Sequence, residues 1–484
     1  MLNFFAISNV SSWDFTLANY GQVWKFLVQL GLLLIFLLIG NILRNSIPFL
    51  RKALIPTALL GGLLLLSVDL ILQAFDFYLV DNRIMQVITY HGLGIGFAAM
   101  SLKIEKKSNK AKKSQIMENG ALQGGAYMLQ GFIGLGITIL LFLLTKGTKN
   151  NTSFISGLLL PLAFGQGPGN ALTWDINYTN NVNNGFAAFG SFGLSLASIG
   201  FIVASVVGVI YINIFKRKNQ IVIRESNSLT EFINHTNPSG DEIPDSESID
   251  KFSIQMGFVA AAYAISFGIM CLLAIISDFT NSIAWGFNFM WAVIGAALIK
   301  TVVVKLHKKK VIKRKYINNY QMDRISGFAF DLMIVAGVAA IQISDIKNYI
   351  LPIIILAAFG SFITYLYIRM VSKECFKGFE HEFFLMSFGT LTGTASNGMI
   401  LLKEIDPNLK TPTSDLYILS TFPATIMIAP LLFLLSFAGN SLINACIVCG
   451  ILFVLWVVYT LFLFRRRIFK KKYQNTSPNV WVEE

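Results

Sequence analysis

Charged residues are scarce in this chain. Only 13% of its 484 residues are charged, while 54% are hydrophobic, and its mean hydropathy is +0.62. A soluble domain carries about a quarter charged residues, and long uncharged apolar runs are typical of transmembrane helices. The alternating pattern of roughly ten-residue segments that marks outer-membrane barrels is also absent. The sequence therefore predicts an all-α polytopic membrane protein.

Motifs for catalysis and nucleotide binding are missing as well. The chain has no HExxH, no GxSxG after a strand, no P-loop and no paired catalytic carboxylates. We therefore expect no enzyme and no cofactor, and any transport must be driven by an ion gradient or by the substrate's own gradient. Cys446 and Cys449 have the spacing of a redox or zinc motif, but they lie in an apolar run without a second ligand pair. We interpret them as small helix residues and expect no metal beyond sodium.

Apolar runs of about 20 residues define the expected membrane spans. Four precede a broken stretch and one follows it: Val23–Leu43, Ala53–Leu72, Ile84–Leu102, Ala121–Leu144 and then Gly185–Phe215. After a polar segment the same order returns, with one additional span at the end: Phe252–Ile276, Gly286–Leu306, Ile325–Ile343, Ile350–Val371, then Tyr417–Phe437 and Leu442–Phe464. The order of elements predicts two five-helix repeats.

Two stretches break the apolar pattern at matching positions. Gly157–Trp174 contains FGQGPGNA from Phe164 to Ala171, and Phe383–Leu402 contains FGTLTGTASNGM from Phe388 to Met399. Glycines and a proline cannot continue a regular helix there, and broken backbone at membrane depth occurs only where protein or a water-filled cavity surrounds it. We expect each stretch to be a re-entrant loop.

The distribution of basic residues predicts the orientation. The net charge of +13 could indicate a nucleic-acid partner, but all except five of the 39 Lys and Arg fall on one side if both loops are re-entrant and the N-terminus faces outside. The exceptions are Lys25, Arg83, Lys146, Lys149 and Lys347. The C-terminus is then cytoplasmic, and no nucleic-acid partner is expected. Because each repeat has five spans, the second is inverted relative to the first, an arrangement typical of secondary transporters.

The expected organisation has four parts. Residues 1–218 form the first membrane repeat, with its re-entrant loop at about 155–175, and residues 219–250 form a cytoplasmic linker. Residues 251–438 form the second repeat, with its loop at about 383–402. Residues 439–484 form an extra transmembrane helix and a basic cytoplasmic tail.

Both broken stretches are rich in neutral donors and acceptors. Half-helix N-termini attract anions and free carbonyl groups coordinate cations, so the stretches suit a substrate site. The alternative is tight helix packing through small residues. The neutral donors and acceptors are Gln166 and Asn170 in the first stretch and Thr390, Thr392, Thr394, Ser396 and Asn397 in the second. The candidate ion-binding residues are Asp331, Asn170 and Thr390.

Ionisable residues inside spans are further candidates. Asp331 could hold sodium or a proton, or else make a buried or interfacial hydrogen bond. His91 could donate to a substrate or be a satisfied polar contact. Asp175 is expected at the membrane interface, and Lys300 is expected to reach the interface from its span.

The two loops resemble those of the glutamate:sodium symporter family. The segments FGQGPGNALTW, GFAAFGSFGLSLASIGFIV and FGTLTGTASNGMILLKEIDP, which begin at Phe164, Gly185 and Phe388, are similar to the first loop, the following span and the second loop of that family. The resemblance implies sodium-coupled uptake of glutamate across a bacterial plasma membrane, by a homodimer with an elevator-like moving domain. It also implies the candidate substrate-binding residues, at the matching loop positions Gln166, Gly167, Gly169, Asn170, Thr392, Thr394, Ser396 and Asn397.

The chain also departs from the family pattern. The family's glutamate carriers read Gly-Gly-His-Gly where this chain has Phe164 to Gly169, and the second loop lacks their Thr-Pro-Thr. The final span is additional. Two other functions therefore stay open: a proton- or sodium-coupled carrier of another small organic anion or amino acid, and a membrane receptor or scaffold that does not transport.

Overall fold

The computed structural model describes residues 17–104, 112–145, 153–181, 185–218, 220–221, 250–407 and 409–468. Of these residues 84% are helical, and none lies in a β-strand. The predicted linker lies almost entirely outside the described residues, as do the ends of the chain and most of the basic loop after Lys103. The all-α class is confirmed for the described part.

Helices follow the predicted spans closely. In the first half they are α1 (Leu17–Ser46), α2 (Pro48–Lys52), α3 (Thr57–Gln73), α4 (Asn82–Leu102), α5 (Lys113–Leu144), a 3-10 turn (Ser156–Leu158), α6 (Leu159–Gln166), α7 (Pro168–Asn180) and α8 (Ser191–Arg217). In the second half they are α10 (Lys251–Ala274), α11 (Asp278–Gly286), α12 (Asn288–Lys308), α13 (Asn319–Ala339), α14 (Ile343–Ile346), α15 (Ile350–Cys375), α16 (Glu380–Thr392), α17 (Ala395–Ile405), α18 (Thr413–Leu419), α19 (Thr421–Ala438) and α20 (Leu442–Ile468).

Eight helices in the described part are long and apolar enough to cross a membrane, compared with the eleven spans expected. They are α1, α5, α8, α10, α12, the α14–α15 segment, α19 and α20. Of the other three expected spans, α3 has only 17 residues, while α4 and α13 carry polar residues such as His91 and Asp331. The eight helices identify a membrane-embedded protein.

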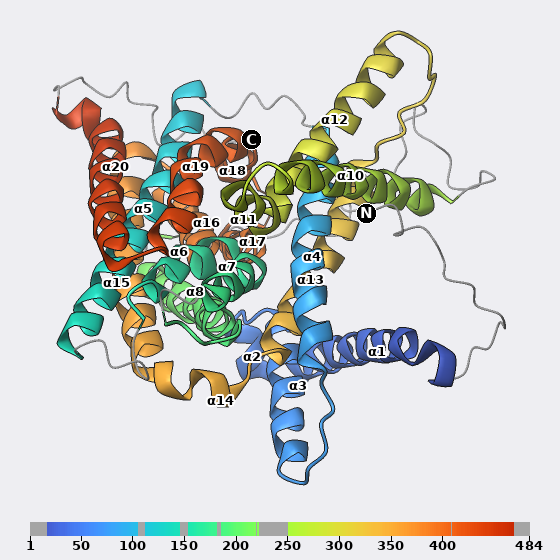
Figure 1. Cartoon of the computed structure of the whole chain (residues 1–484). Coiled ribbons are helices and arrows are strands. Elements are labelled where there is room, and N and C mark those ends of the chain that lie inside the picture. Colours follow the sequence, from blue (N-terminus) through green and yellow to red (C-terminus); the bar gives the residue numbers. More distant parts are fainter. Residues whose placement is uncertain are drawn as a thin grey trace.

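The helices pack in two groups, which lie on opposite sides of the view in Figure 1. The α4–α13 group contains α1, α3, α4, α10, α12 and α13, and its centre is the contact between α4 and α13. The α5–α15 group contains α5 to α8 and α15 to α20. The two groups meet where α7 packs against α4 and α13. Each group thus combines helices from both halves of the sequence.

Packing partners in the α4–α13 group match between the two halves. The pair α1 and α3 corresponds to α10 and α12, and the pair α3 and α13 corresponds to α12 and α4. The α5–α15 group is less regular. Helices α8 and α19 occupy corresponding places in the two halves, but α8 packs against both broken segments whereas α19 packs against α5 and α20. These pairs fit a repeat, and the inversion of one half relative to the other stays a prediction.

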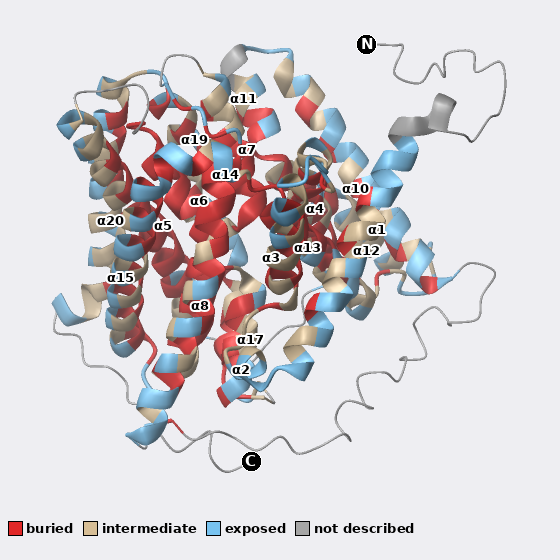
Figure 2. Cartoon of the chain, turned by 90° about the horizontal axis from the view of Figure 1, so that it is seen from below, coloured by how far each residue is buried: buried red, intermediate tan, exposed pale blue. Residues whose placement is uncertain are grey.

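Burial is greatest around the broken segments. Figure 2 shows buried residues concentrated in α5, α6, α7 and α8, with exposed residues on the outer helices. The additional helix α20 is fastened to α5 by a buried carboxylate. Glu118 Oε1 accepts a hydrogen bond from Arg465 Nη2 at 2.8 Å and forms an ion pair with Arg466 Nη2 at 3.2 Å. The additional helix is therefore part of the packed core.

Candidate functional site

Each predicted break is present, and each is narrower than the sequence suggested. Regular helix α6 continues to Gln166, and α7 begins two residues later at Pro168. In the second segment α16 continues to Thr392, and α17 begins at Ala395. Helical structure therefore includes most of the Phe164–Ala171 stretch, because glycines inside it still allow helix when neighbouring helices pack on them.

Gly167 is the residue that forms the first break. Its φ of 78° and ψ of −167° lie in a region that is accessible essentially only to glycine. Pro168 then occupies the first position of α7, where its fixed φ suits a helix and its missing N–H leaves no donor unsatisfied. The Gly-Pro pair thus ends one helix and starts the next within a single residue.

Neighbours along α8 locate the two segments relative to each other. A Cβ on Gly193, near the start of α8, would lie 2.5 Å from the carbonyl oxygen of Ala171. A Cβ on Gly208, further along, would lie 2.5 Å from Leu401 Cδ2. Between them, a Cβ on Gly200 would lie next to both the Phe164 ring, with Cδ1 at 3.1 Å, and the Thr392 carbonyl oxygen. The segments therefore approach α8 from its two ends and meet near Gly200.

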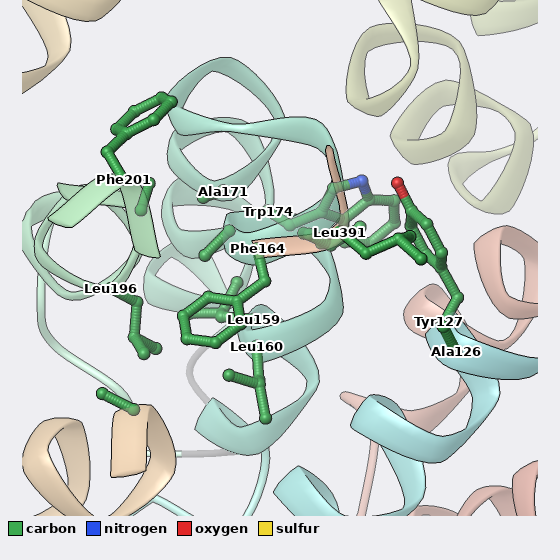
Figure 3. Close-up of a cluster of buried hydrophobic side chains, with 14 of the residues drawn as sticks. Ala126, Tyr127, Leu159, Leu160, Phe164, Ala171, Trp174, Leu196, Phe201 and Leu391 are labelled. Carbon is green, nitrogen blue, oxygen red and sulfur yellow. The ribbon is translucent and has the colours of Figure 1, made fainter. Parts of the chain in front are cut away.

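The two tips lie close together. A Cβ on Gly167 would lie 3.1 Å from Thr394 Cγ2, 3.8 Å from Met333 Cε and 3.9 Å from Phe201 Cζ. Apolar side chains surround this point, and Figure 3 shows Phe164, Phe201 and Leu391 among the buried cluster. Gly167, Asn170, Thr392 and Asn397 are buried at this point, whereas Gln166 and Thr394 are partly exposed.

Several buried polar atoms at this meeting point have no hydrogen-bond partner in the described part of the protein. They are Asn170 Oδ1, Thr394 Oγ1, both side-chain polar atoms of Asn397, and Gln130 Oε1. Burying such an atom unpaired costs about 1–3 kcal/mol, so a cluster of them needs an explanation. A bound ligand that supplies partners would remove this cost. The unpaired atoms make the two tips the strongest candidate for a binding site.

Helix ends add electrostatic character to the tips. The N-termini of α7 and α17 each present free N–H groups and about half a positive charge, whereas the C-termini of α6 and α16 present free carbonyl groups and the opposite partial charge. The named tip side chains are neutral. An anion can therefore bind at the N-termini while a cation binds to carbonyl and amide oxygens nearby.

The structure brings together most of the predicted substrate residues. Asn170 Nδ2 donates to Gln166 Oε1, Gly167 touches Thr394, and Thr392 is fully buried next to Gly200. With Asn397 these residues form the tip cluster: Gln166, Gly167, Asn170, Thr392, Thr394 and Asn397.

The other predicted loop residues lie around this cluster. Gly169 packs against α4, since a Cβ there would lie 2.8 Å from Leu93 Cβ. Thr390 is buried and donates to the Met386 carbonyl at 2.8 Å. Ser396 is exposed. Gly169 is thus a packing residue, and no hydrogen bond joins Thr390 or Ser396 to the first tip among the described residues.

Asp331 points away from the tips. Its side chain is exposed, and it has no hydrogen bond or ion pair among the described residues. Because Asp331 precedes Met333 by two residues, helical geometry places it on nearly the opposite side of α13 from the side that faces Gly167. The structure does not join Asp331 to the tip cluster.

Two other ionisable candidates have structural partners. His91 Nδ1 and Tyr263 Oη are 2.7 Å apart, which is the satisfied polar contact. Asp175 is completely buried and accepts 2.7 Å hydrogen bonds from the amides of Gly190 and Gly193. Asp175 therefore caps the N-terminus of α8 and stabilises the helix on which both segments pack.

Sequence reasoning missed Gln130 and Tyr127 on α5. Gln130 Nε2 donates to Thr364 Oγ1 at 2.8 Å and to the Leu391 carbonyl at 2.9 Å, so it joins α5, α15 and the second tip. The Tyr127 hydroxyl lies beside Gly165 and interacts with Gln166. The only signal was a single amide and a single phenol in an apolar run.

Comparison with known proteins does not assign this chain. No protein-family model matches it, and no curated protein matches it. The resemblance to glutamate:sodium symporters therefore stays a hypothesis, and function has to be argued from the tip cluster.

Proposed function

We propose that the chain is a secondary transporter that couples uptake of glutamate, or of a closely related small acid, to sodium. The observation that carries the proposal is the set of unpaired buried polar atoms where the two helix breaks meet. Those atoms are neutral, numerous and contributed by both segments, which suits a polar ligand held between them. Packing alone would favour apolar groups at these positions.

Helix ends support the choice of an acid together with a cation. The N-termini of α7 and α17 suit carboxylate groups, and the C-terminal carbonyls of α6 and α16, with Asn170 Oδ1, suit sodium. A bound anion and a bound cation would attract each other, and each would interact favourably with the helix ends of opposite partial charge. This arrangement explains how a site without charged side chains binds ions.

The approach of the segments from the two ends of α8 supports alternating access. A site between opposed broken helices lies near mid-membrane, and movement of the α5–α15 group relative to the α4–α13 group would expose it to one side and then to the other. The proposal includes glutamate as the substrate and sodium as the coupling ion. It also includes a homodimer in a bacterial plasma membrane.

Uptake by purified protein in liposomes tests the proposal. We expect labelled glutamate to accumulate only under an inward sodium gradient. Asn397→Leu should lower uptake at least tenfold, because a loss of about 1.4 kcal/mol of binding is tenfold. Its thermal unfolding temperature without ligand should not fall, since the change removes two unpaired buried polar atoms.

A matched control is Thr425→Val. Thr425 is exposed on α19 and bonds only within its own helix, to the Thr421 carbonyl at 2.9 Å. This variant should keep wild-type uptake. If another acid is accumulated in preference to glutamate, the proposed substrate is wrong but the assignment as a transporter is supported. If no amino acid or dicarboxylate is accumulated under sodium or proton gradients, the receptor or scaffold interpretation is favoured.

A further inference from the structure

A polar cavity of about 390 Å³ lies away from the tip cluster, where α7 ends and α4 begins. Its walls come from α4, from the end of α7, from the segment before α8 and from the connection between α13 and α15. The polar residues that line it include Asn82, Arg83, Gln86, Asn180, Gln342 and Asp345. Thr179 lines it too and lies eleven residues after Pro168, or about 16 Å along α7. The cavity is thus separate from the tips and connected to them by one helix.

Two opposite charges line this cavity without pairing. Arg83 and Asp345 both face it, yet neither forms an ion pair with any described residue within 4.0 Å. Of the other basic residues nearby, Lys25 is paired with Asp81, and Lys347 does not line the cavity. Separated charges across a polar cavity leave room for a molecule that carries both charges.

The charge distribution of the whole chain makes Arg83 unusual. It is one of the few basic residues that the positive-inside pattern places outside, so it does not set the topology there. Lys25 at the same end of the protein is explained by its partner Asp81. Arg83 has no such partner among the described residues and, unlike Lys347, lines the cavity, which favours a role in binding.

We infer that this cavity is an outer recruitment site for a small zwitterionic amino acid. Arg83 binds a carboxylate, Asp345 binds the ammonium group, and the amides of Asn82 and Gln342 supply further hydrogen bonds. The part it plays in transport rests on the proposed function. Binding itself does not depend on the loop tips.

The cavity also lies between the two helix groups. Gln86 on α4 donates to the Phe189 carbonyl, just before α8, over 2.9 Å. Since α4 belongs to one group and α7 and α8 to the other, relative movement of the groups changes the cavity walls. A bound amino acid would therefore leave this site as the groups move.

Protection from labelling tests the site without any need for transport. The full chain with Asn180→Cys is expressed in right-side-out vesicles and treated with a membrane-impermeant maleimide in potassium buffer free of sodium. The unsubstituted protein measures the background from its four native cysteines. We expect external glutamate to slow the labelling.

Charge variants in the same background assign the two roles. Arg83→Gln should raise the half-protecting concentrations of glutamate and of 2-oxoglutarate about two- to fivefold, the effect of one exposed charged contact. Asp345→Asn should raise only that of glutamate, because 2-oxoglutarate has no ammonium group. Lys347→Gln is the matched control, since Lys347 is exposed nearby and does not line the cavity. It should change neither value.

Several outcomes would overturn the inference. Absence of protection by glutamate, or equal protection in Arg83→Gln, would remove the site. Equal effects of Asp345→Asn on both acids would remove the zwitterion assignment. Failure of sodium-driven uptake with protection intact would instead refute the proposed function and leave the amino-acid site supported. Sodium-driven uptake without protection from labelling would refute the amino-acid site and leave the proposed function supported.

Discussion

Gly167→Ala is the most informative perturbation of the tip cluster. An alanine has to adopt the φ of 78° and ψ of −167° that Gly167 has between α6 and α7. That conformation costs about 1–3 kcal/mol for a residue with a Cβ. The new Cβ would also lie 3.1 Å from Thr394 Cγ2, so the second tip must shift by a few tenths of an ångström.

The two contributions can be separated. We expect Gly167→Ala to lose about 2–3 kcal/mol of unfolding free energy in total. Thr394→Ser removes the Cγ2 atom and keeps the hydroxyl. In the double variant the steric contribution should vanish while the backbone contribution remains. A double-mutant cycle should therefore show coupling of about 0.5–1 kcal/mol between these positions.

Equilibrium unfolding in mixed micelles and sodium-driven uptake in liposomes are the two assays. If the lost free energy comes from substrate binding at the distorted site, uptake should fall ten- to a hundredfold. Each 1.4 kcal/mol of binding free energy corresponds to a tenfold change in affinity. The control is Gly136→Ala, where a Cβ meets no atom within 4 Å inside helix α5. The control should be neutral or slightly stabilised. A Gly167→Ala protein with wild-type stability and uptake would refute the argument.

Three further predictions concern access, packing and pH. A cysteine at Gln166 should be labelled from outside and one at Ser396 from the cytoplasm, as measured with impermeant reagents. Asp175→Ala should lower the unfolding free energy by about 1–3 kcal/mol, because two buried N–H groups at the start of α8 lose their acceptor. Burial, assisted by the charge of Arg369, lowers the pKa of His381 to about 4, and His381 precedes the apolar part of its segment. As the pH is lowered from about 6.5 to 4, His381 binds a proton in the unfolded chain but not in the folded one, so the free energy of unfolding should fall. His381→Gln should reduce that fall.

Each of these has a clear contrary result. Labelling of both cysteines from one face would contradict the inverted arrangement. Asp175→Asn keeps one acceptor oxygen and should lose less stability than Asp175→Ala, so equal losses would contradict the capping role. Thermal unfolding at pH 7, 6 and 5 checks His381, and identical acid sensitivity of His381→Gln and wild type would contradict the burial argument.

The helices and the breaks could be predicted from local sequence. Runs of about 20 apolar residues predicted helices such as α5 and α20, because a chain in lipid must satisfy its backbone hydrogen bonds internally. Gly167 and Pro168 predicted a break, because one has a backbone conformation closed to other residues and the other lacks an N–H. The extent of the break was overestimated, since small residues inside a packed helix do not end it.

Contacts between distant segments could not be predicted in the same way. The helical periodicity of α13 does not show which side faces the site, so Asp331 looked like a candidate although it lies on the side away from Met333. Gln130 lies far in sequence from Thr364 and Leu391, and only packing brings its amide to both. Gly169 resembled a ligand because glycines allow close approach, and the structure uses that property for packing on α4.

The sequence by itself determined that this is an all-α membrane protein with two helix breaks, since hydropathy, glycine and proline act through local chain geometry. The tertiary structure decided that the breaks meet beside Gly200, that several of their polar atoms are buried without a partner in the described part of the protein, and that Arg83 and Asp345 line one cavity. Those features depend on how helices from both halves pack together. A one-dimensional pattern does not contain that information, because the same apolar helix can pack on any neighbour that fits its surface.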